Sequence, residues 1–428
     1  MTFAAGATTA VSASPRMIER VVSPGGIEAW LVEEHAVPLI AMEIAFVGGA
    51  AQDPAGKHGA GYLLASLLDE GAGPYDADAF QEKLAEKAIE LHFTADRDAW
   101  RGSLKTLARH ADEAFALLRL ALCEPRLDTA AVERVRAQVL AGLRHEAKDP
   151  DTLANRAFFA AAFPNHPYGH PIRGTLDSVE AVGRADLDDL RRRGLARSNL
   201  VVSVVGAIDA ATLARHLDAV FGALPATADL VEVPEIAPDG LGSRTVVDVD
   251  VPQSVIRFGG PGIARRDPDF MPAFVLNHIL GGGAFTSRLF QEVREKRGLA
   301  YGVSTGLMPL RRAAMFTGGT ATKNERAAES LAVIREEIGK LLAEGPSADE
   351  LAKAKQYLIG SYALNFDTST KIASQLVQIA LEGLGIDYID RRNDLVAAVT
   401  AEDLRRAAQR LYGAGELLVV VAGRPVGL

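Results

Sequence analysis

The sequence is poor in cysteine and lacks long apolar runs. Cys123 is the only cysteine, so an intramolecular disulfide and a cysteine-based zinc cluster are both excluded. No apolar stretch approaches the roughly 20 residues that a membrane-spanning helix needs. We therefore expect a soluble protein without membrane insertion.

An excess of positive charge is also missing. The 428 residues include 46 Lys and Arg against 55 Asp and Glu, a formal net charge of -9, which argues against nucleic acid as a partner. The hydrophobic share of 48% and the charged share of 24% are ordinary for a globular protein. The length predicts two or three domains.

The first 16 residues lack the features of a secretory signal. They contain no Lys or Arg before Arg16 and no strongly apolar centre. The segment predicts a disordered leader over residues 1–16, with a processed export signal as the alternative. The compartment, cytoplasm or periplasm, is left open by the sequence.

What the sequence does contain is one internal repeat. "VPLIAMEIAFVGG" and "VPQSVIRFGG" each predict a strand that ends at paired glycines, and each is preceded by another predicted strand. An Asp-Pro pair, an apolar helix (61–68; 273–280) and a glycine cluster follow in both halves. Two long helices come next (112–122 and 130–146; 326–342 and 348–364), and a hydrophobic strand closes each half.

Residues 225–243 are rich in Pro, Asp and Gly and only weakly periodic, as expected of a linker. The sequence thus predicts an α+β fold of two similar domains, 17–224 and 244–428. Each domain is expected to hold a mainly antiparallel sheet with helices on one side. A duplicated domain offers a cleft between its halves, and clefts of that kind are common binding sites.

The order of these motifs resembles the pitrilysin-like M16 peptidase family, which includes the mitochondrial processing peptidases. The resemblance covers nearly the whole chain and rests on "DPAGK", the apolar helix after it, "PNHPYGHPIRGT" and "LGGGAFTSRLFQEVREKRGLAYGVST". It implies a LuxS/MPP-like metallohydrolase fold. It also implies a helix that carries His-x-x-Glu-His in catalytic members, where two histidines bind Zn²⁺ and the glutamate activates water.

In this chain the corresponding positions are Tyr62, Ala65 and Ser66. The family's third ligand, a glutamate, aligns with Gly142, although Glu146 lies one turn away. A phenol and a hydroxyl are poor zinc ligands, and alanine cannot act as a general base. We therefore expect neither a metal ion nor a catalytic residue on this chain. From the helix alone, an ordinary amphipathic helix is the alternative.

The segment "SRLFQEVREKRGLAYG" predicts a helix with Leu289, Phe290 and Val293 inward. The helix is expected to stop at Gly298, and a strand to begin at Tyr301.

The resemblance gives two residues of this segment a role. It implies that Arg294 and Tyr301 hold substrate near the zinc ion, since both side chains can donate hydrogen bonds to peptide carbonyls and to an oxyanion. The alternative for Arg294 is a solvated or ion-paired surface arginine. Its neighbour Arg297 is expected to be mainly structural.

The glycine run of Gly281, Gly282 and Gly283 lacks the order of a phosphate-binding loop. Three glycines after a helix end it and permit a tight turn. The resemblance adds a substrate-handling role, since the non-catalytic processing-peptidase subunit has a glycine-rich loop here, although this run is much shorter. His166 and His170 lie among prolines, which predicts a turn and not a metal-binding helix.

These observations favour one function and leave two others open. The first is the zinc-free, substrate-binding subunit of a heterodimeric M16 metallopeptidase. A homologous partner would supply His-x-x-Glu-His and Zn²⁺, and peptides or unfolded polypeptides would be the substrate. The second is a structural or peptide-binding scaffold without a catalytic partner. The third is a peptidase that acts alone with unfamiliar ligands.

Overall fold

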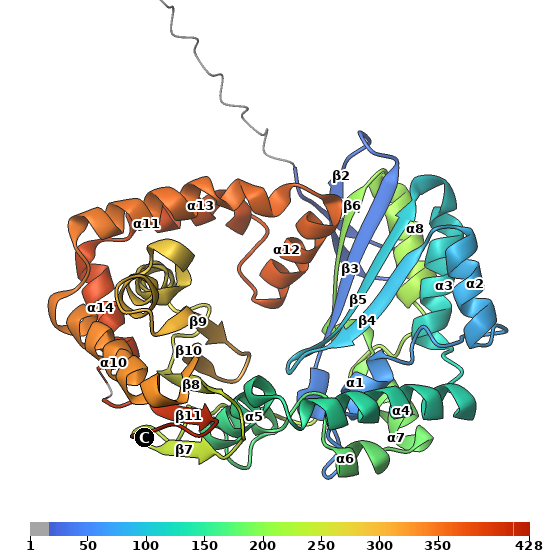
Figure 1. Ribbon diagram of the computed structural model, residues 1–428. Helices are drawn as coiled ribbons and strands as arrows, with labels where there is room; N and C mark the ends of the chain where they lie inside the picture. Colours follow the sequence, from blue (N-terminus) through green and yellow to red (C-terminus); the bar gives the residue numbers. More distant parts are fainter. Residues whose placement is uncertain (1–16, 414) are drawn as a thin grey trace, which may run out of the picture.

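The computed structural model describes residues 17–413 and 415–428, so the predicted leader lies outside the described residues. Two sheets, each with its own set of helices, form two halves of the molecule (Figure 1). The predicted α+β fold of two duplicated domains is confirmed.

The first sheet has six strands in the order β1-β2-β6-β3-β5-β4. The β2–β6 pair is parallel and the other pairs are antiparallel. The strands are β1 (Glu19–Val22), β2 (Glu28–Glu33), β3 (Leu39–Val47), β4 (Glu90–Ala95), β5 (Ala99–Leu107) and β6 (Leu200–Gly206).

The second sheet repeats this arrangement with five strands in the order β7-β11-β8-β10-β9. Its single parallel pair, β7–β11, corresponds to β2–β6 of the first sheet. Strands β2, β6, β3, β5 and β4 of the first sheet correspond one by one to β7, β11, β8, β10 and β9 of the second. This correspondence shows that the fold is duplicated. The strands are β7 (Arg244–Val247), β8 (Gln253–Pro261), β9 (Ala300–Pro309), β10 (Ala314–Lys323) and β11 (Leu418–Ala422).

Eight α-helices belong to the described part of the first half and six to that of the second. None of the described helices is both long and apolar enough to span a bilayer. Those of the first half are α1 (Ala60–Ala65), α2 (Ala77–Glu86), α3 (Ala111–Cys123), α4 (Thr129–Glu146), α5 (Pro150–Ala162), α6 (Leu176–Glu180), α7 (Arg184–Gly194) and α8 (Ala210–Phe221). Those of the second are α9 (Phe270–Asn277), α10 (Ala327–Glu344), α11 (Ala348–Gly360), α12 (Ser369–Leu381), α13 (Tyr388–Ala398) and α14 (Ala401–Tyr412).

Three predicted helices differ from the observed ones at their C-terminal ends. Helix α1 ends at Ala65 instead of residue 68, because the backbone tightens into a turn in which Leu67 N–H donates to the carbonyl of Leu64 at 3.0 Å. Helix α11 ends at Gly360 instead of residue 364. Helix α9 continues as a π-helix, η5 (His278–Gly282).

Each half also lends one helix to the other half's sheet. Helix α12 packs on β3 and β6 of the first sheet, and α5 packs on β8 and β11 of the second. Ser203 of β6 donates a 2.6 Å hydrogen bond to the carbonyl of Ala373 on α12. Every residue of β11 is buried, because α5 covers one face of its sheet and the helices of its own half cover the other. Such two-sided burial selects a continuous apolar strand over an alternating one.

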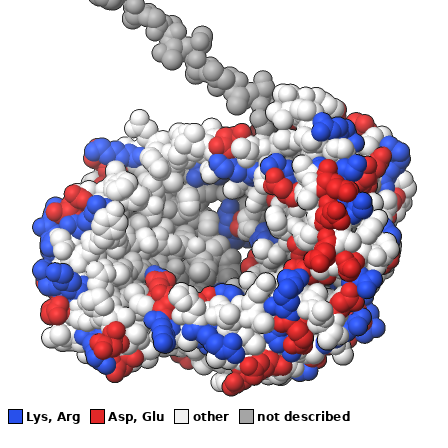
Figure 2. Space-filling view, turned by 45° about the vertical axis from the view of Figure 1, so that its right-hand side comes forward, with Lys and Arg blue, Asp and Glu red and all other residues white. Residues whose placement is uncertain are grey.

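The exchanged helices α5 and α12, together with the helices that lead to them, enclose a hollow between the halves. In Figure 1, α11 and α13 run across the top toward α12, while α4 and α5 run across the bottom. The space-filling view in Figure 2 shows that the molecule is hollowed between these arms. Charged side chains gather on the rim and over the first half, whereas the wall on the side of the second half carries few of them (Figure 2).

Candidate functional site

Helix α1, where the sequence resemblance predicts the zinc helix, is held at its start by a buried carboxylate. Asp53 accepts hydrogen bonds from the backbone N–H groups of Gly59 at 2.6 Å and Gly61 at 2.7 Å. Gly59 has a φ of 98°, a conformation that favours glycine. Burial raises the pKa of Asp53 to about 7, while these hydrogen bonds oppose the shift.

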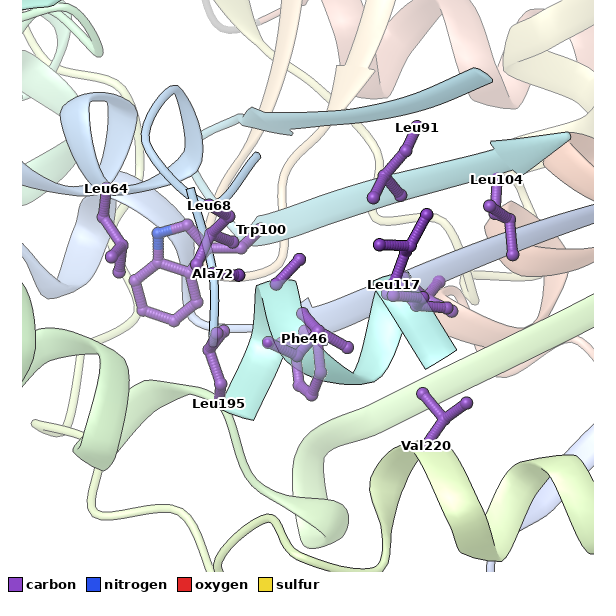
Figure 3. Close-up of a cluster of buried hydrophobic side chains, with 14 of the residues drawn as sticks. Phe46, Leu64, Leu68, Ala72, Leu91, Trp100, Leu104, Leu117, Leu195 and Val220 are labelled. Atoms are coloured by element: carbon purple, nitrogen blue, oxygen red, sulfur yellow. The ribbon is translucent and has the colours of Figure 1, made fainter. Parts of the chain in front are cut away.

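The apolar side of α1 forms part of the core of the first half. Leu63, Leu64, Leu67 and Leu68 are all buried, and Figure 3 shows Leu64 and Leu68 beside Trp100 of β5. The packing stripe seen in the sequence is therefore real. The row of buried leucines is longer than the helix, because Leu67 and Leu68 follow the C-terminus of α1.

The other side of α1 lacks the chemistry of a metal site. Ala65 is buried and offers no general base. The Ser66 hydroxyl donates to the carbonyl of Tyr62 at 2.9 Å, so it satisfies the backbone at the end of the helix. The guanidinium of Arg173 lies 5.3 Å from the centre of the Tyr62 ring and forms an ion pair with Glu146.

The residues at this place do not fit a zinc ion. The aligned positions hold a phenol, a methyl group, a hydroxyl that donates to the backbone and a glycine, whereas zinc prefers thiolate, imidazole and carboxylate ligands. The carboxylate on α4 beside them, Glu146, is already paired with the Arg173 guanidinium. Across residues 17–413 and 415–428, no cluster of three or more His, Cys, Asp or Glu could hold a metal ion.

The second candidate site surrounds Arg294. It lies on η7 (Phe290–Glu295), a π-helix that ends in a turn at Gly298, where φ is 57°. The predicted helix thus exists in a wider form, with Leu289, Phe290 and Val293 buried as expected, and β9 begins at Ala300, one residue before the predicted start.

Three aromatic rings surround the Arg294 guanidinium. The distances from its central carbon to the ring centres are 4.6 Å for Tyr301, 4.7 Å for Phe290 and 6.0 Å for Phe285. Its one ionic contact among the described residues is with Glu295 at 3.5 Å. Tyr301 is 86% exposed and Phe285 68% exposed, which is unusual for aromatic side chains of this size. The structure thus brings Arg294 and Tyr301 together at the surface.

Arg297 has a different environment. Its guanidinium donates to the Glu292 backbone carbonyl at 3.0 Å and also pairs with the Glu292 carboxylate. Arg297 therefore fixes the end of η7, and Arg294 is the arginine whose donors remain available.

The three glycines after α9 are explained by close packing. A Cβ atom added to Gly281 would lie 2.6 Å from Oγ1 of Thr305 on β9, and one added to Gly283 would lie 2.6 Å from the carbonyl oxygen of His278. Gly282 is similarly confined by Asn277. The run lets η5 lie directly against β9.

Strand β9 also borders a groove between the two halves. It lies at the edge of the second sheet, and the groove, about 320 Å³ in volume, lies between its open face and α5. Phe158 and Phe159 of α5 form one wall. The other wall is the face of the sheet, formed by β9 together with residues 317–319 of β10 and Arg257 of β8. A Cβ atom added to Gly306 would meet nothing within 4 Å, so this part of the edge strand is open.

The segment with His166 and His170 is a turn, as its prolines predict. Its 3₁₀ turn, η3, covers Pro167–Gly169. His166 is buried and contacts the carbonyl of Pro234 at 3.0 Å. His170 stacks instead on His58, with 3.6 Å between ring centres.

Two family models match most of this chain. One, described as insulinase (peptidase family M16), matches residues 31–176. The other, described as the peptidase M16 inactive domain, matches residues 181–358. The chain belongs to the M16 peptidase family.

Among relatives of this M16 chain, the non-peptidase homolog YmxG of Helicobacter pylori is 28% identical over 83% of this chain and 82% of the relative. An uncharacterized zinc protease of Mycobacterium tuberculosis is 26% identical over 96% and 94%. A solved structure described as the peptidase M16 inactive domain from Pseudomonas fluorescens has a TM-score of 0.90 at 26% identity, covering 96% of this chain and 98% of the other. The relatives of this M16 chain thus include one described as a non-peptidase homolog and others described as zinc proteases.

Sequence reasoning missed two residues that matter in this M16 chain. Arg173 stands in "HPIRGT" without any pattern that predicts its contact with α1 and α4. Tyr168 is fully buried, and its phenol pairs with the Asp98 carboxylate and accepts from Arg312 N–H at 3.1 Å. Because Arg312 lies between β9 and β10, Tyr168 joins the two halves next to the groove.

Proposed function

We propose that this chain is the zinc-free, substrate-binding subunit of a two-chain M16 metallopeptidase. A homologous partner carries His-x-x-Glu-His and the Zn²⁺ ion, and this chain presents Arg294 and Tyr301 to the peptide. The observation that supports the proposal most strongly is the contrast between the two candidate sites. The groups at α1 are committed to internal contacts, while Arg294 keeps donors available beside an exposed Tyr301.

The edge strand suggests how a peptide would bind. An extended segment can add to β9 through backbone hydrogen bonds, because the outer edge of β9 has no neighbouring strand in the sheet. Arg294 and Tyr301 lie at the N-terminal end of β9 and the groove lies further along it. On its other side β9 is packed closely by η5, where Gly281 lies against Thr305.

Arg294 and Tyr301 can both bind the peptide backbone as hydrogen-bond donors. Guanidinium and phenol groups both donate hydrogen bonds to carbonyl oxygens. Donors fixed before the reaction also stabilise the oxyanion that forms when water attacks a peptide carbonyl. The aromatic rings around Arg294 hold its guanidinium in position through cation–π contacts.

The proposal is tested in the reconstituted complex. The full chain is purified together with the product of a neighbouring gene that carries an intact His-x-x-Glu-His, and peptide cleavage is measured. Arg294→Ala should lower kcat/KM by about 10- to 100-fold, as loss of a charged hydrogen-bond donor does, and Tyr301→Phe by several-fold. Lys296→Ala is the matched control, because its side chain is an exposed cation on the same turn.

Unchanged cleavage by both variants in an intact complex would favour the scaffold function. Failure of any His-x-x-Glu-His subunit to bind the chain would remove the support for a heterodimer. Peptide cleavage by the isolated chain would point instead to a peptidase that acts alone.

A further inference from the structure

The guanidinium of Arg173 occupies the place on α4 where the family's third zinc ligand would project. A Cβ atom added to Gly142 would lie 2.7 Å from one terminal nitrogen of Arg173 and 3.6 Å from its central carbon. The same guanidinium lies over the Tyr62 ring, at the position of the first ligand. One cationic side chain thus stands between two former ligand positions.

The structure holds Arg173 in this place from both ends. On the backbone side, its carbonyl lies so close to Gly59 that an added Cβ atom would be 2.7 Å away, and the next residue, Gly174, packs as closely on the carbonyl of His58. On the side-chain side, the guanidinium pairs with Glu146 of α4. Its Nε is buried and makes no hydrogen bond with the described residues. Arg173 therefore connects the start of α1 with α4.

We propose that Arg173 is a built-in cation that replaces the metal ion, bridges α1 and α4, and excludes divalent cations from this place. A divalent ion at the former site would lie within a few ångströms of the guanidinium, where two positive charges repel strongly. It would also compete with Arg173 for Glu146, the nearest carboxylate on α4. On this view, restoring the lost ligands alone does not restore metal binding. The inference does not depend on the proposed function of Arg294.

Zinc titration of the full chain tests the exclusion. One variant restores the ligand types with Tyr62→His, Ser66→His and Gly142→Glu; a second adds Arg173→Ala; a third instead adds Arg134→Ala. Arg134 is the matched control, since it also lies on the first half and pairs with a carboxylate, Glu70. Competition with a chromophoric chelator measures Zn²⁺ affinity, and circular dichroism verifies the fold of each variant.

We expect Arg173→Ala to increase the Zn²⁺ affinity of the restored chain by about 100-fold or more, and Arg134→Ala to leave it unchanged. Stoichiometric Zn²⁺ binding by the restored chain with Arg173 in place would overturn the proposal. Equal affinity with and without Arg173 would overturn it as well, because the barrier would then lie elsewhere.

The bridging role has its own measurement in the otherwise natural chain, which avoids any effect of the restored ligands. Arg173→Met should lower the melting temperature more than Arg134→Met, because it removes contacts with both α1 and α4. An equal or smaller decrease would contradict the bridge.

Discussion

Single arginines have opposite environments in the two halves of this protein. Arg173 is surrounded by an ion pair and a ring from its own half, whereas Arg294 has aromatic neighbours and one long ionic contact. The sequence singles out Arg294 through the family resemblance, but nothing in it marks Arg173. The side chains around them decide that one closes a former site and that the other can bind a ligand.

A stacked pair of histidines next to the start of α1 predicts pH-dependent stability. His58 and His170 stack, and burial lowers the pKa of both; the charge of His170 adds to this effect on His58, as that of His166 does on His170. An unfolded chain therefore binds protons at a higher pH than the folded one, so stability should decrease as the pH falls below about 6.5. We expect the histidine pair to lower the melting temperature between pH 7.5 and pH 5.5. Asp53 contributes in the opposite direction, because its raised pKa of about 7 lets the folded chain bind that proton first. The contribution of the pair is therefore read from the difference between variants.

The variant His170→Gln should reduce the decrease that the histidine pair causes, and His145→Gln, which changes an exposed histidine on α4, should not. Scanning calorimetry at the two pH values provides the measurement. A pH dependence that is identical in all three chains would show that the stacked pair does not contribute.

At the level of secondary structure, the exchanged helices α5 and α12 are the elements that join the halves. Leu376 of α12 is fully buried and packs with Val32 and Val205 of the first sheet. The matching cluster on the second sheet includes Phe158 of α5 with Val420 of β11. Each sheet therefore depends on a helix that is distant in the sequence.

The substitution Leu376→Ala, made in the second half, should destabilise the first half. A buried Leu→Ala change costs about 2–5 kcal/mol. The only two tryptophans, Trp30 and Trp100, lie on β2 and β5, so tryptophan fluorescence during urea unfolding reports on the first sheet. Leu395→Ala, at a partly exposed position of α13, is the control and should change stability by no more than about 0.5 kcal/mol. An unchanged urea midpoint for Leu376→Ala would show that α12 contributes little to the first sheet.

At the scale of the whole molecule, two connections besides the hydrogen bond between Arg312 N–H and Tyr168 keep the halves together around the hollow. The exchanged helices form one. The other is the segment between the sheets, where Gln52 of the first half exchanges two hydrogen bonds with the backbone of Val231, at 2.7 and 3.0 Å. We propose 17–224 and 244–428 as the domains and 225–243 as the linker, with the domains dependent on each other for folding.

Separate expression of residues 1–243 and 244–428 tests this dependence. Each fragment lacks the helix that covers one face of its sheet, so each should expose apolar surface and bind the dye ANS strongly. Co-expression should yield one complex that binds little dye. Two fragments that are folded, monomeric and free of dye binding would contradict the mutual dependence.

Much of this architecture follows from local patterns in the sequence. The repeated strands, the paired glycines and the apolar helices predict a duplicated α+β fold, because side-chain periodicity and turn residues act over a few neighbouring positions. The expectation that Tyr62, Ala65 and Ser66 bind no zinc ion also comes from the sequence, since it depends on residue type alone. The predicted helices run past the observed ends, to residue 68 instead of 65 and to residue 364 instead of 360. Apolar residues continue past the point where the chain turns, so the sequence pattern does not mark the end of either helix.

The sequence by itself determined the family resemblance, the duplication and the residue types at the positions that align with the zinc motif. Only the tertiary structure decided that α5 and α12 are exchanged, that Arg173 fills the space beside Gly142, and which aromatic rings surround Arg294. The physical reason is that these features depend on contacts between residues far apart along the chain. Such contacts leave no periodic or spacing signal in a single sequence.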